Sequence, residues 1–235
     1  MIEREYAALN RHDVDAVFAD YADTLSYGDL GDTSLAKRTT KAALKARIGP
    51  FLAANPRLHL EVPHEIAFGP FVIAHEAVSG AADGKPLSIL DISDVRNGRV
   101  VAELEVDFPT TPTAMSSQAA STARMADEAF ARHAPEAAMQ AYAETVLDHV
   151  WGEDSIRHLT KAALTKGFHD AMTANPHMRF AVLQRFVVGP YVVVHEQLSG
   201  MADGKRLEAF DVMEVRAGRI VVEWECPWVA SSGER

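Results

Sequence analysis

The spacing of apolar residues changes from a helical period to a strand period within the first half of the chain. Residues 3–11 carry apolar side chains at helical spacing, and Asp13 can cap a second helix over residues 13–21. A third helix over residues 40–53 can be capped by Thr39 or Thr40 and must end before the Asn-Pro pair that follows it. Beyond this point apolar and polar residues alternate with a period of two, which predicts strands over residues 58–66, 71–79, 87–95 and 99–108.

Two short polar stretches separate the last three of these strands. They are ADGK at 82–85 and RNGR at 96–99, and Asp83-Gly84 and Asn97-Gly98 suit two-residue hairpin turns that need a positive φ. Helices therefore come first and an antiparallel meander follows. This order predicts an α+β layer with the helices on one face of a curved sheet.

The chain contains an internal sequence repeat. HEAVSGAADGK at 75–85 returns as HEQLSGMADGK at 195–205. Residues 40–105 align without gaps on residues 160–225, with 29 of 66 positions identical. Upstream of this block the offset between the copies becomes 121, so that RHDVDAVFADYADT faces RHAPEAAMQAYAET. A unit of roughly 110 residues has the size of a small domain.

The two copies predict a two-domain organisation. Between them lies TTPTAMSSQAAS, which is small, polar and uncharged, as is typical of an exposed linker. We therefore expect one domain over residues 1–109, a linker over 110–121 and a second domain over 122–230.

Composition narrows the classes of function. The 235 residues are 48% hydrophobic and carry 23 basic against 33 acidic side chains, a net charge of −10. Such a surface repels phosphate backbones and anionic lipid, which argues against nucleic-acid and membrane partners. The single cysteine, Cys226, allows no intrachain disulfide. The first residues, MIEREYAALN, lack an apolar signal core, and no apolar run is long enough to span a bilayer, so we expect a cytoplasmic protein.

Several of these motifs together resemble a known family. YAALNRHDVDAVFADYADTLSYGD, the third helix, VHE-x-x-SG and GRIVVEW are similar to the nuclear-transport-factor-2-like superfamily, and most of all to its SnoaL-like and ketosteroid-isomerase-like branch. The resemblance covers both copies. It implies two tandem cone-shaped, cystatin-like domains, each with three helices packed on a curved antiparallel sheet and a pocket between them. The superfamily includes isomerases, dehydratases, epoxide hydrolases, polyketide cyclases and binding modules.

The strand FVIAHEAV offers apolar side chains on both faces. One face can pack on the helices of its own copy, and the other needs a second partner. A tandem chain supplies that partner at high effective concentration, and members of the family commonly pair sheet against sheet. We therefore expect a covalent pseudo-dimer whose sheets face each other across Val72, Leu104, Val192 and Trp224, with a further homodimer possible. Two independent domains are the alternative.

Asp29 is the first candidate catalytic residue. The resemblance places it where the steroid isomerases carry the aspartate that shuttles the proton, and a carboxylate in an apolar pocket becomes a usable general base because its pKa rises. In the second copy the matching residue is Val150, so the first copy is expected to hold the better-equipped site. The alternative is that Asp29, within YGDLGD, is an ordinary turn residue.

Asp91 is the second candidate, and Asp211 is its counterpart. It resembles the pocket acid that stays protonated in the isomerases and donates to a developing oxyanion. The tyrosine that completes the family's oxyanion hole falls at Glu5, with Tyr6 one position away. One residue on a helix is ~100° of rotation, so Tyr6 would point elsewhere unless the register slips.

His75 and His195 are the third candidates. The resemblance places the row that contains His75 and Ser79 on the concave side, together with the matching row of His195 and Ser199, and it points Glu76 away. A concave histidine could pair with Asp91 or with a ligand. The alternative is a core histidine bonded to a neighbouring strand.

The last strand of each copy carries acids on one row and apolar residues on the other. Alternation alone would place the apolar row in a core and the acids in water, whereas the resemblance implies that the acids face the pocket. Burying several unpaired carboxylates costs several kcal/mol each, so we expect Glu103 and Glu105, like Glu223 and Glu225, at a wet pocket mouth, with the apolar row at the interface between the copies. The alternative is that these acids face solvent outright. No HxH or HExxH spacing is present, and we expect neither a metal nor a cofactor.

Two classes of function remain. The first is a cofactor-free acid–base enzyme that acts on a small, largely apolar molecule in the pocket of the first copy, as an isomerase, dehydratase or cyclase. The second is a non-catalytic module for small-molecule binding or assembly that has kept a degenerate pocket.

Overall fold

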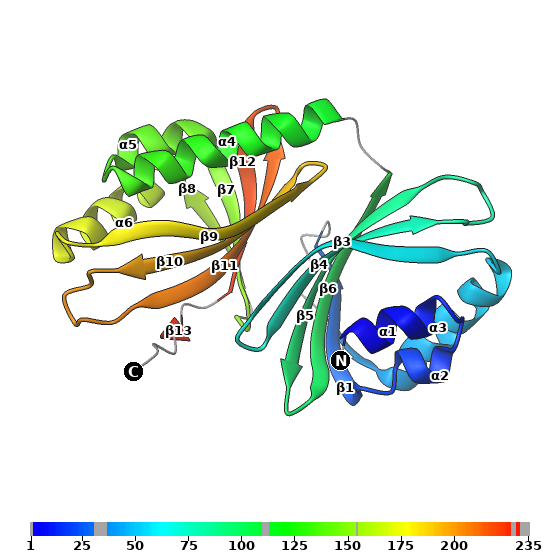
Figure 1. The fold of residues 1–235 in the computed structure, drawn as a ribbon. Helices are drawn as coiled ribbons and strands as arrows, with labels where there is room; N and C mark the ends of the chain where they lie inside the picture. The colour runs from blue at the N-terminus through cyan, green and yellow to red at the C-terminus, as the bar shows by residue number, and fades with distance from the viewer. Residues whose placement is uncertain (1, 31–36, 110–112, 154, 227–228, 231–235) are drawn as a thin grey trace. The chain divides into compact units, whose positions relative to one another are not determined.

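The protein consists of two compact domains (Figure 1). The structure is a computed structural model that describes residues 2–30, 37–109, 113–153, 155–226 and 229–230. The first compact unit is Met1–Thr110 and the second is Thr111–Arg235, and we call them the first and the second domain. Both have the α+β, cystatin-like architecture that the sequence predicts.

The first domain places its helices on one face of a mixed sheet. Its elements are α1 (Ile2–Leu9), α2 (Val14–Val17), β1 (Tyr21–Asp29), β2 (Lys37–Thr40), α3 (Lys41–Ala54), β3 (His59–Phe68), β4 (Phe71–Ser79), β5 (Leu87–Arg96) and β6 (Arg99–Pro109). The strand order is β2-β1-β6-β5-β4-β3, and β1 runs parallel to β6 while the other neighbours are antiparallel. The helices gather on one side of this sheet (Figure 1).

The second domain repeats this plan. Its elements are α4 (Thr113–Ala131), α5 (Pro135–Ala138), the 3₁₀ turn η1 (Met139–Ala141), β7 (Tyr142–Val150), β8 (Ile156–Thr160), α6 (Lys161–Ala174), β9 (Arg179–Val188), β10 (Tyr191–Ser199), β11 (Leu207–Arg216), β12 (Arg219–Glu225) and β13 (Val229–Ala230). The strand order is β8-β7-β12-β11-β10-β9, and the short β13 pairs with β11.

Capping side chains and the Asn-Pro pair set most helix ends where the sequence predicts them. The Asp13 side chain accepts a hydrogen bond from the backbone N–H of Ala16 at 3.1 Å, and Thr40 accepts one from Ala43 at 3.1 Å. The third helix ends at Ala54, before the Asn-Pro pair. The turn at Asn97-Gly98 has φ values of 51° and 73°, as predicted.

Two predictions about the elements of the first domain are wrong. The second helix stops at Val17 instead of continuing to residue 21, because Tyr21 begins a strand whose Tyr21 and Leu25 side chains are buried. Strands β1 and β2 were therefore missed, and the sheet is not a simple four-stranded meander. The connection at ADGK is also longer than a two-residue hairpin, since β4 ends at Ser79 and β5 begins at Leu87.

The predicted linker is mostly helix. Residues 110–112 lie outside the described residues, but residues 113–121 form the first half of α4. The reason is packing at helical spacing, because Ala119, Ala123 and Ala126 are almost fully buried in the core of the second domain. The second half of the predicted linker is therefore the mostly exposed first turns of a helix, which Ala119 begins to anchor in the core.

Strand register decides which side chains face the helices. Val72 pairs with Ser93 across β4 and β5 and packs on the core cluster beneath the helices, whereas Leu104 pairs with Ile92 on the other face. Val192 likewise belongs to the core cluster under α4. The expectation that Val72 and Leu104 share one outer face is therefore wrong.

Candidate functional site

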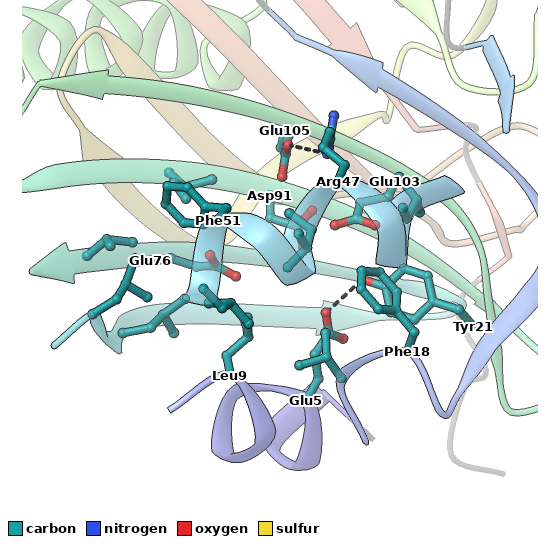
Figure 2. A pocket seen from close by; sticks show the side chains of 18 of the residues that line it. Glu5, Leu9, Phe18, Tyr21, Arg47, Phe51, Glu76, Asp91, Glu103 and Glu105 are labelled. Atoms are coloured by element: carbon teal, nitrogen blue, oxygen red, sulfur yellow. Dashed lines mark hydrogen bonds and ion pairs between the residues drawn. The ribbon is translucent and has the colours of Figure 1, made fainter. Parts of the chain in front are cut away.

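A cavity of about 130 Å³ lies between the helices and the sheet of the first domain. Apolar side chains from α1, α2 and α3 form its helix wall, and acidic side chains from α1, β4, β5 and β6 reach it. Figure 2 shows Glu76, Asp91 and Glu103 pointing into this space from the sheet, with Glu5 reaching it from α1. The lining residues are Glu5, Leu9, Val17, Phe18, Tyr21, Tyr27, Leu44, Arg47, Ile48, Phe51, Leu52, Leu58, Leu60, Glu76, Val78, Leu87, Ile89, Asp91, Glu103 and Glu105.

Strand register brings the acids together. Asp91 lies opposite Glu105 across β5 and β6, and Glu76 lies opposite Ile89 across β4 and β5. Side chains two apart on a strand share a face, and neighbouring strands are ~4.8 Å apart. Glu76, Asp91, Glu103 and Glu105 therefore form one row of carboxyl groups across three strands.

Tyr21 connects a fifth carboxyl group, that of Glu5 on α1, to this row. Its hydroxyl donates a hydrogen bond of 2.7 Å to Glu5 (Figure 2), and it also forms a hydrogen bond with Glu103 that lowers the pKa of that acid. The Asp91 carboxyl accepts a hydrogen bond of 3.0 Å from Ser93, and its other oxygen is buried without a hydrogen-bond partner. A buried oxygen in this state is available to a ligand.

Burial and mutual repulsion keep these acids protonated to unusually high pH. Burial, then the charge of Glu103, raises the pKa of Glu76 to about 8, and burial raises the pKa of Glu103 to about 7 against the opposing hydrogen bond from Tyr21. The same causes, burial first, raise the pKa values of Asp91 and Glu5 well above their ordinary range. Charges this close cannot all ionise, so the group shares protons at neutral pH.

Arg47 stands at the mouth of the cavity. Its guanidinium lies 3.5 Å from Glu105 (Figure 2), and it covers the ring of Tyr27 at 4.5 Å from the centroid. It is the one basic side chain among the lining residues that the structure describes. Burial and the nearby Asp107 still raise the pKa of Glu105 to about 7.

The second domain carries a larger cavity with the same acid row. Its volume is about 400 Å³, and Glu196, Asp211, Glu223 and Glu225 line it at the positions that match the acids of the first domain. The Tyr142 hydroxyl donates a hydrogen bond of 2.8 Å to Glu223. Burial is the largest cause of the shifts here too. It raises the pKa of Glu196 to about 8 and that of Glu225 to about 7, and it raises the pKa values of Asp211 and Glu223 well above their ordinary range.

Two ion pairs distinguish this second cavity. Asp127 of α4 pairs with Arg185 of β9, and Asp148 of β7 pairs with Arg157 of β8. Arg157 also lies 3.3 Å from Glu225, the counterpart of the glutamate that Arg47 contacts in the first domain. Asp127, Asp148 and Arg157 all line the cavity.

Six of the residues that the sequence singled out do line the cavities. They are Asp91, Glu103 and Glu105 in the first domain and Asp211, Glu223 and Glu225 in the second. The acid row of the last strand faces the pocket, as the family resemblance implied. Glu103 lies deep beside Tyr21 and Glu105 lies at the mouth, so only the outer glutamate fits the expected wet position.

The two histidines and two serines lie on the opposite face of their sheets, which corrects the expected placement. His75 pairs with Leu90 while Asp91 pairs with Ala74, so His75 and Asp91 face opposite ways. His195 lies 3.2 Å from Glu208 and against the ring of Phe210. Ser79 and Ser199 follow their histidines by four positions and share that outer face. The alternative of a core histidine bonded to a neighbouring strand describes His195.

Asp29 and Tyr6 lie near the first cavity without lining it. Asp29 pairs with Glu105 across β1 and β6 but is exposed at the end of its strand. Tyr6 is buried, and its hydroxyl approaches Glu76 without a hydrogen bond of regular geometry. The proton-shuttle role of Asp29 stays a prediction, and the tyrosine that makes a hydrogen bond of regular geometry to an acid of the cavity is Tyr21.

Glu76, Glu196, Tyr21 and Tyr142 were missed as site residues. A signal was present for each, because the glutamate is repeated in the His-Glu pair and the tyrosine in the matching stretches YADT and YAET. Only the strand register, which reverses the expected faces of the His-Glu pair, shows that the glutamate is the half of that pair that reaches the cavity.

The part of the chain that the structure describes has neither a metal cluster nor a membrane-spanning helix. No three histidine, cysteine, aspartate or glutamate side chains in that part of the chain are arranged to hold a metal ion. Within the same residues, no helix combines the length and apolar character that a membrane crossing requires.

Comparison with known families identifies the fold. The model of the SnoaL-like domain matches residues 2–103 and again residues 122–223. The chain belongs to the SnoaL-like domain family. It contains two copies of that domain, and their bounds agree with the repeat in the sequence and with the two compact units.

Solved structures of similar proteins each match about half of this SnoaL-like chain. An NTF2-like protein of unknown function from Mesorhizobium loti is 24% identical, covers 49% of this chain and 95% of its own, and has a TM-score of 0.43. A cystatin-fold protein from Novosphingobium aromaticivorans is 20% identical, covers 45% of this chain and 93% of its own, and has a TM-score of 0.40. None of the curated proteins matches the chain.

Proposed function

We propose that this protein is a cofactor-free acid–base enzyme acting on a small, largely apolar, uncharged molecule. The reaction would be of the isomerase, dehydratase or cyclase type. One observation carries the proposal: each cavity holds a row of buried and half-buried carboxyl groups joined to a tyrosine, and burial raises the pKa values of these groups to neutral pH or above. Such a group shares protons at neutral pH, so its protonated and ionised members can serve as acid and base at the same pH.

The acids of the first domain divide naturally into two roles. Glu103, with a pKa of about 7, is partly ionised at neutral pH and can take a proton from a carbon next to a carbonyl group. Asp91 stays protonated and can donate to the carbonyl oxygen, which receives the electron pair of the broken C–H bond. Return of the proton from Glu103 to a different carbon completes an isomerisation.

Both domains qualify for this chemistry. The sequence favoured the first domain because Asp29 has no counterpart in the second, but Asp29 lies outside the cavity. In the second domain Glu225, with a pKa of about 7, would be the base, and Asp211 would be the acid.

Ring opening of 5-nitrobenzisoxazole tests the proposal, because this neutral compound reacts by loss of one carbon-bound proton to a general base. This two-ring compound fits the larger cavity of the second domain, so we expect Glu103→Gln combined with Glu225→Gln to lower the protein-catalysed rate by about 10²-fold, the usual contribution of a positioned base, with most of the loss due to Glu225. Glu144→Gln is the matched control, since Glu144 is exposed on β7 and outside both cavities. A rate that the double variant leaves unchanged would contradict the proposal and favour the second candidate, a non-catalytic binding module.

That second candidate rests on one observation. The only residue that the sequence assigned as a proton shuttle, Asp29, does not line the cavity, so the acid row stands without it. A domain that keeps a pocket and lacks a shuttle can still bind small molecules.

A further inference from the structure

The helix wall of the cavity differs sharply between the two domains. Arg47 and Phe51 of α3 line the first cavity, and the repeat aligns them with Gly167 and Ala171 of α6, which line the second. The side chains of Arg47 and Phe51 are about half exposed, at 52% and 47%, so they stand where the first cavity opens. In the second domain the same places on the helix carry almost no side chain.

Gly167 has no backbone reason to be glycine. It lies within α6, its φ is not positive, and a Cβ placed on it would meet nothing within 4 Å. Glycine in a helix interior is destabilising by roughly 0.5–1 kcal/mol relative to alanine. The residue therefore costs stability without serving a turn or a close approach, and what it provides is open space at the cavity wall.

The positive charge of the first mouth is kept in the second domain but comes from another element. Arg47 contacts Glu105 from a helix, whereas Arg157 contacts the matching Glu225 from strand β8. Because Arg157 lies on a strand, Glu225 keeps an arginine partner while the helix wall of the second cavity stays open.

An aromatic group lines the second cavity. The rings of Phe130 and Phe168 are 4.3 Å apart between centroids, and those of Phe130 and Phe180 are 6.0 Å apart. All three line the cavity, and their counterparts in the first domain are the aliphatic Leu9, Ile48 and Leu60. Although these rings are larger than the side chains they replace, the second cavity is about 400 Å³ against about 130 Å³.

These volumes set the size of the ligand. A cavity of ~150 Å³ holds one benzene molecule. The first cavity is therefore limited to about one ring, and the second has room for two or three. Offset or edge-to-face contact with aromatic side chains favours a flat ligand.

We propose that the second domain binds a neutral aromatic molecule of two or three rings, and that Arg47 and Phe51 exclude this molecule from the first domain. Its rings lie against Phe130, Phe168 and Phe180, and an oxygen atom faces Asp211 and Glu223. This inference deepens the proposed function and rests on it for the role of the acid row as hydrogen-bond donor. An anionic ligand is disfavoured because the members of the row that are partly ionised at neutral pH, such as Glu225 with its pKa of about 7, would repel it, whereas the protonated members can donate to a neutral oxygen.

Calorimetric titration of the full chain with 2-naphthol tests the inference. We expect one site per chain. Ala171→Phe and Gly167→Arg, each of which copies the first domain, should weaken binding by about tenfold or more, since even one methylene in a filled pocket is worth that much. Ala162→Phe is the matched control, because Ala162 is exposed on the same helix and does not line the cavity.

The reciprocal change opens the first domain. Arg47→Gly combined with Phe51→Ala should raise the number of binding sites from one to two. Saturated 2-decalol, which has similar size and the same hydroxyl group, should bind the wild-type chain roughly three- to tenfold more weakly, as expected for lost aromatic contacts. Circular dichroism shows whether each variant is folded. If either Ala171→Phe or Gly167→Arg fails to fold, the other variant still tests the inference.

Several results would overturn the inference. They are two equal sites in the wild-type chain, unchanged binding in folded Ala171→Phe and Gly167→Arg proteins, or equal binding of 2-decalol. 2-Naphthol is not consumed, so the outcome is separate from that of the proton-transfer assay. One-site binding without ring opening of 5-nitrobenzisoxazole would support this inference while removing the proposed function.

Discussion

At the scale of single residues, burial decides what each carboxyl group can do. Asp29 and Asp91 were both candidates in the sequence, but Asp29 is exposed at a strand end and Asp91 is 6% exposed within the row of acids. The sequence could name Asp91, Glu103 and Glu105 because the family resemblance points these positions toward the pocket. It could not name Glu76, because the choice between the neighbouring His75 and Glu76 depends on which face of β4 turns toward the helices.

The raised pKa values predict that the protein is more stable in mild acid than in mild base. Glu103 and Glu76 have ordinary values of 4.5 that rise to about 7 and about 8 in the fold, so the folded state binds more protons than the unfolded state between these limits. Their contribution to stability is complete below about pH 4.5 and is lost as pH rises through 8. We expect the free energy of unfolding in urea to fall by a few kcal/mol between pH 5.5 and 8.5.

A pair of variants isolates this effect. Combining Glu103→Gln with Glu76→Gln removes two titrating groups, so the difference between the two pH values should shrink. Glu61→Gln, an exposed change on β3, should leave it as in the wild type. Stability that rises steadily from pH 5.5 to 8.5 would show that these acids are not held protonated in the fold.

At the scale of elements, the repeated motifs serve structure as well as chemistry. Asn55 ends α3 and accepts a hydrogen bond of 2.7 Å from the backbone N–H of Ala82, and Asn175 accepts one of 3.0 Å from Ala202. The repeated ANP and ADGK stretches thus join the end of the third helix to the loop after β4. Caps and turns of this kind were predictable because they are local. Strand β1 was not, because its place beside β6 depends on a parallel contact distant in sequence.

Gly80 is the most constrained point of this loop. It has a φ of +75°, and a Cβ at this position would lie 1.8 Å from the carbonyl oxygen of Arg57. Gly84 has a similar φ of +72° but nothing within 4 Å of an added Cβ. We expect Gly80→Ala to lower the free energy of unfolding by at least about 2 kcal/mol more than Gly84→Ala, because only the first adds a backbone clash to the φ strain. Equal losses in chemical denaturation would contradict this account of the SG motif.

At the scale of the whole molecule, the chain repeats one domain twice, and the two copies share an acid row and differ in the helix wall above it. The sequence alone predicted the duplication, the fold and the domain count. It did not predict the difference between the cavities, because cavity volume depends on how Arg47 and Phe51 are placed over the acids, and this follows from helix position rather than from any motif.

The pairing of the two domains stays a proposal that rests on the pattern of the strands. On the face away from the helices the first sheet carries Ile73, Leu90, Ile92 and Leu104, and an apolar sheet face of this kind needs a partner to cover it. We expect the full chain to unfold in a single transition by calorimetry. Two separate transitions would favour independent domains.

The central claim is that buried carboxyl groups stay protonated in the cavities at neutral pH. Infrared difference spectroscopy measures this directly, because a protonated carboxyl group has a carbonyl stretch that a carboxylate lacks. At pH 7 we predict that the wild-type protein shows this band and that Asp91→Asn and Asp211→Asn each remove part of it, since burial raises the pKa of both residues well above the ordinary range. A wild-type spectrum at pH 7 with carboxylate bands only would contradict the account.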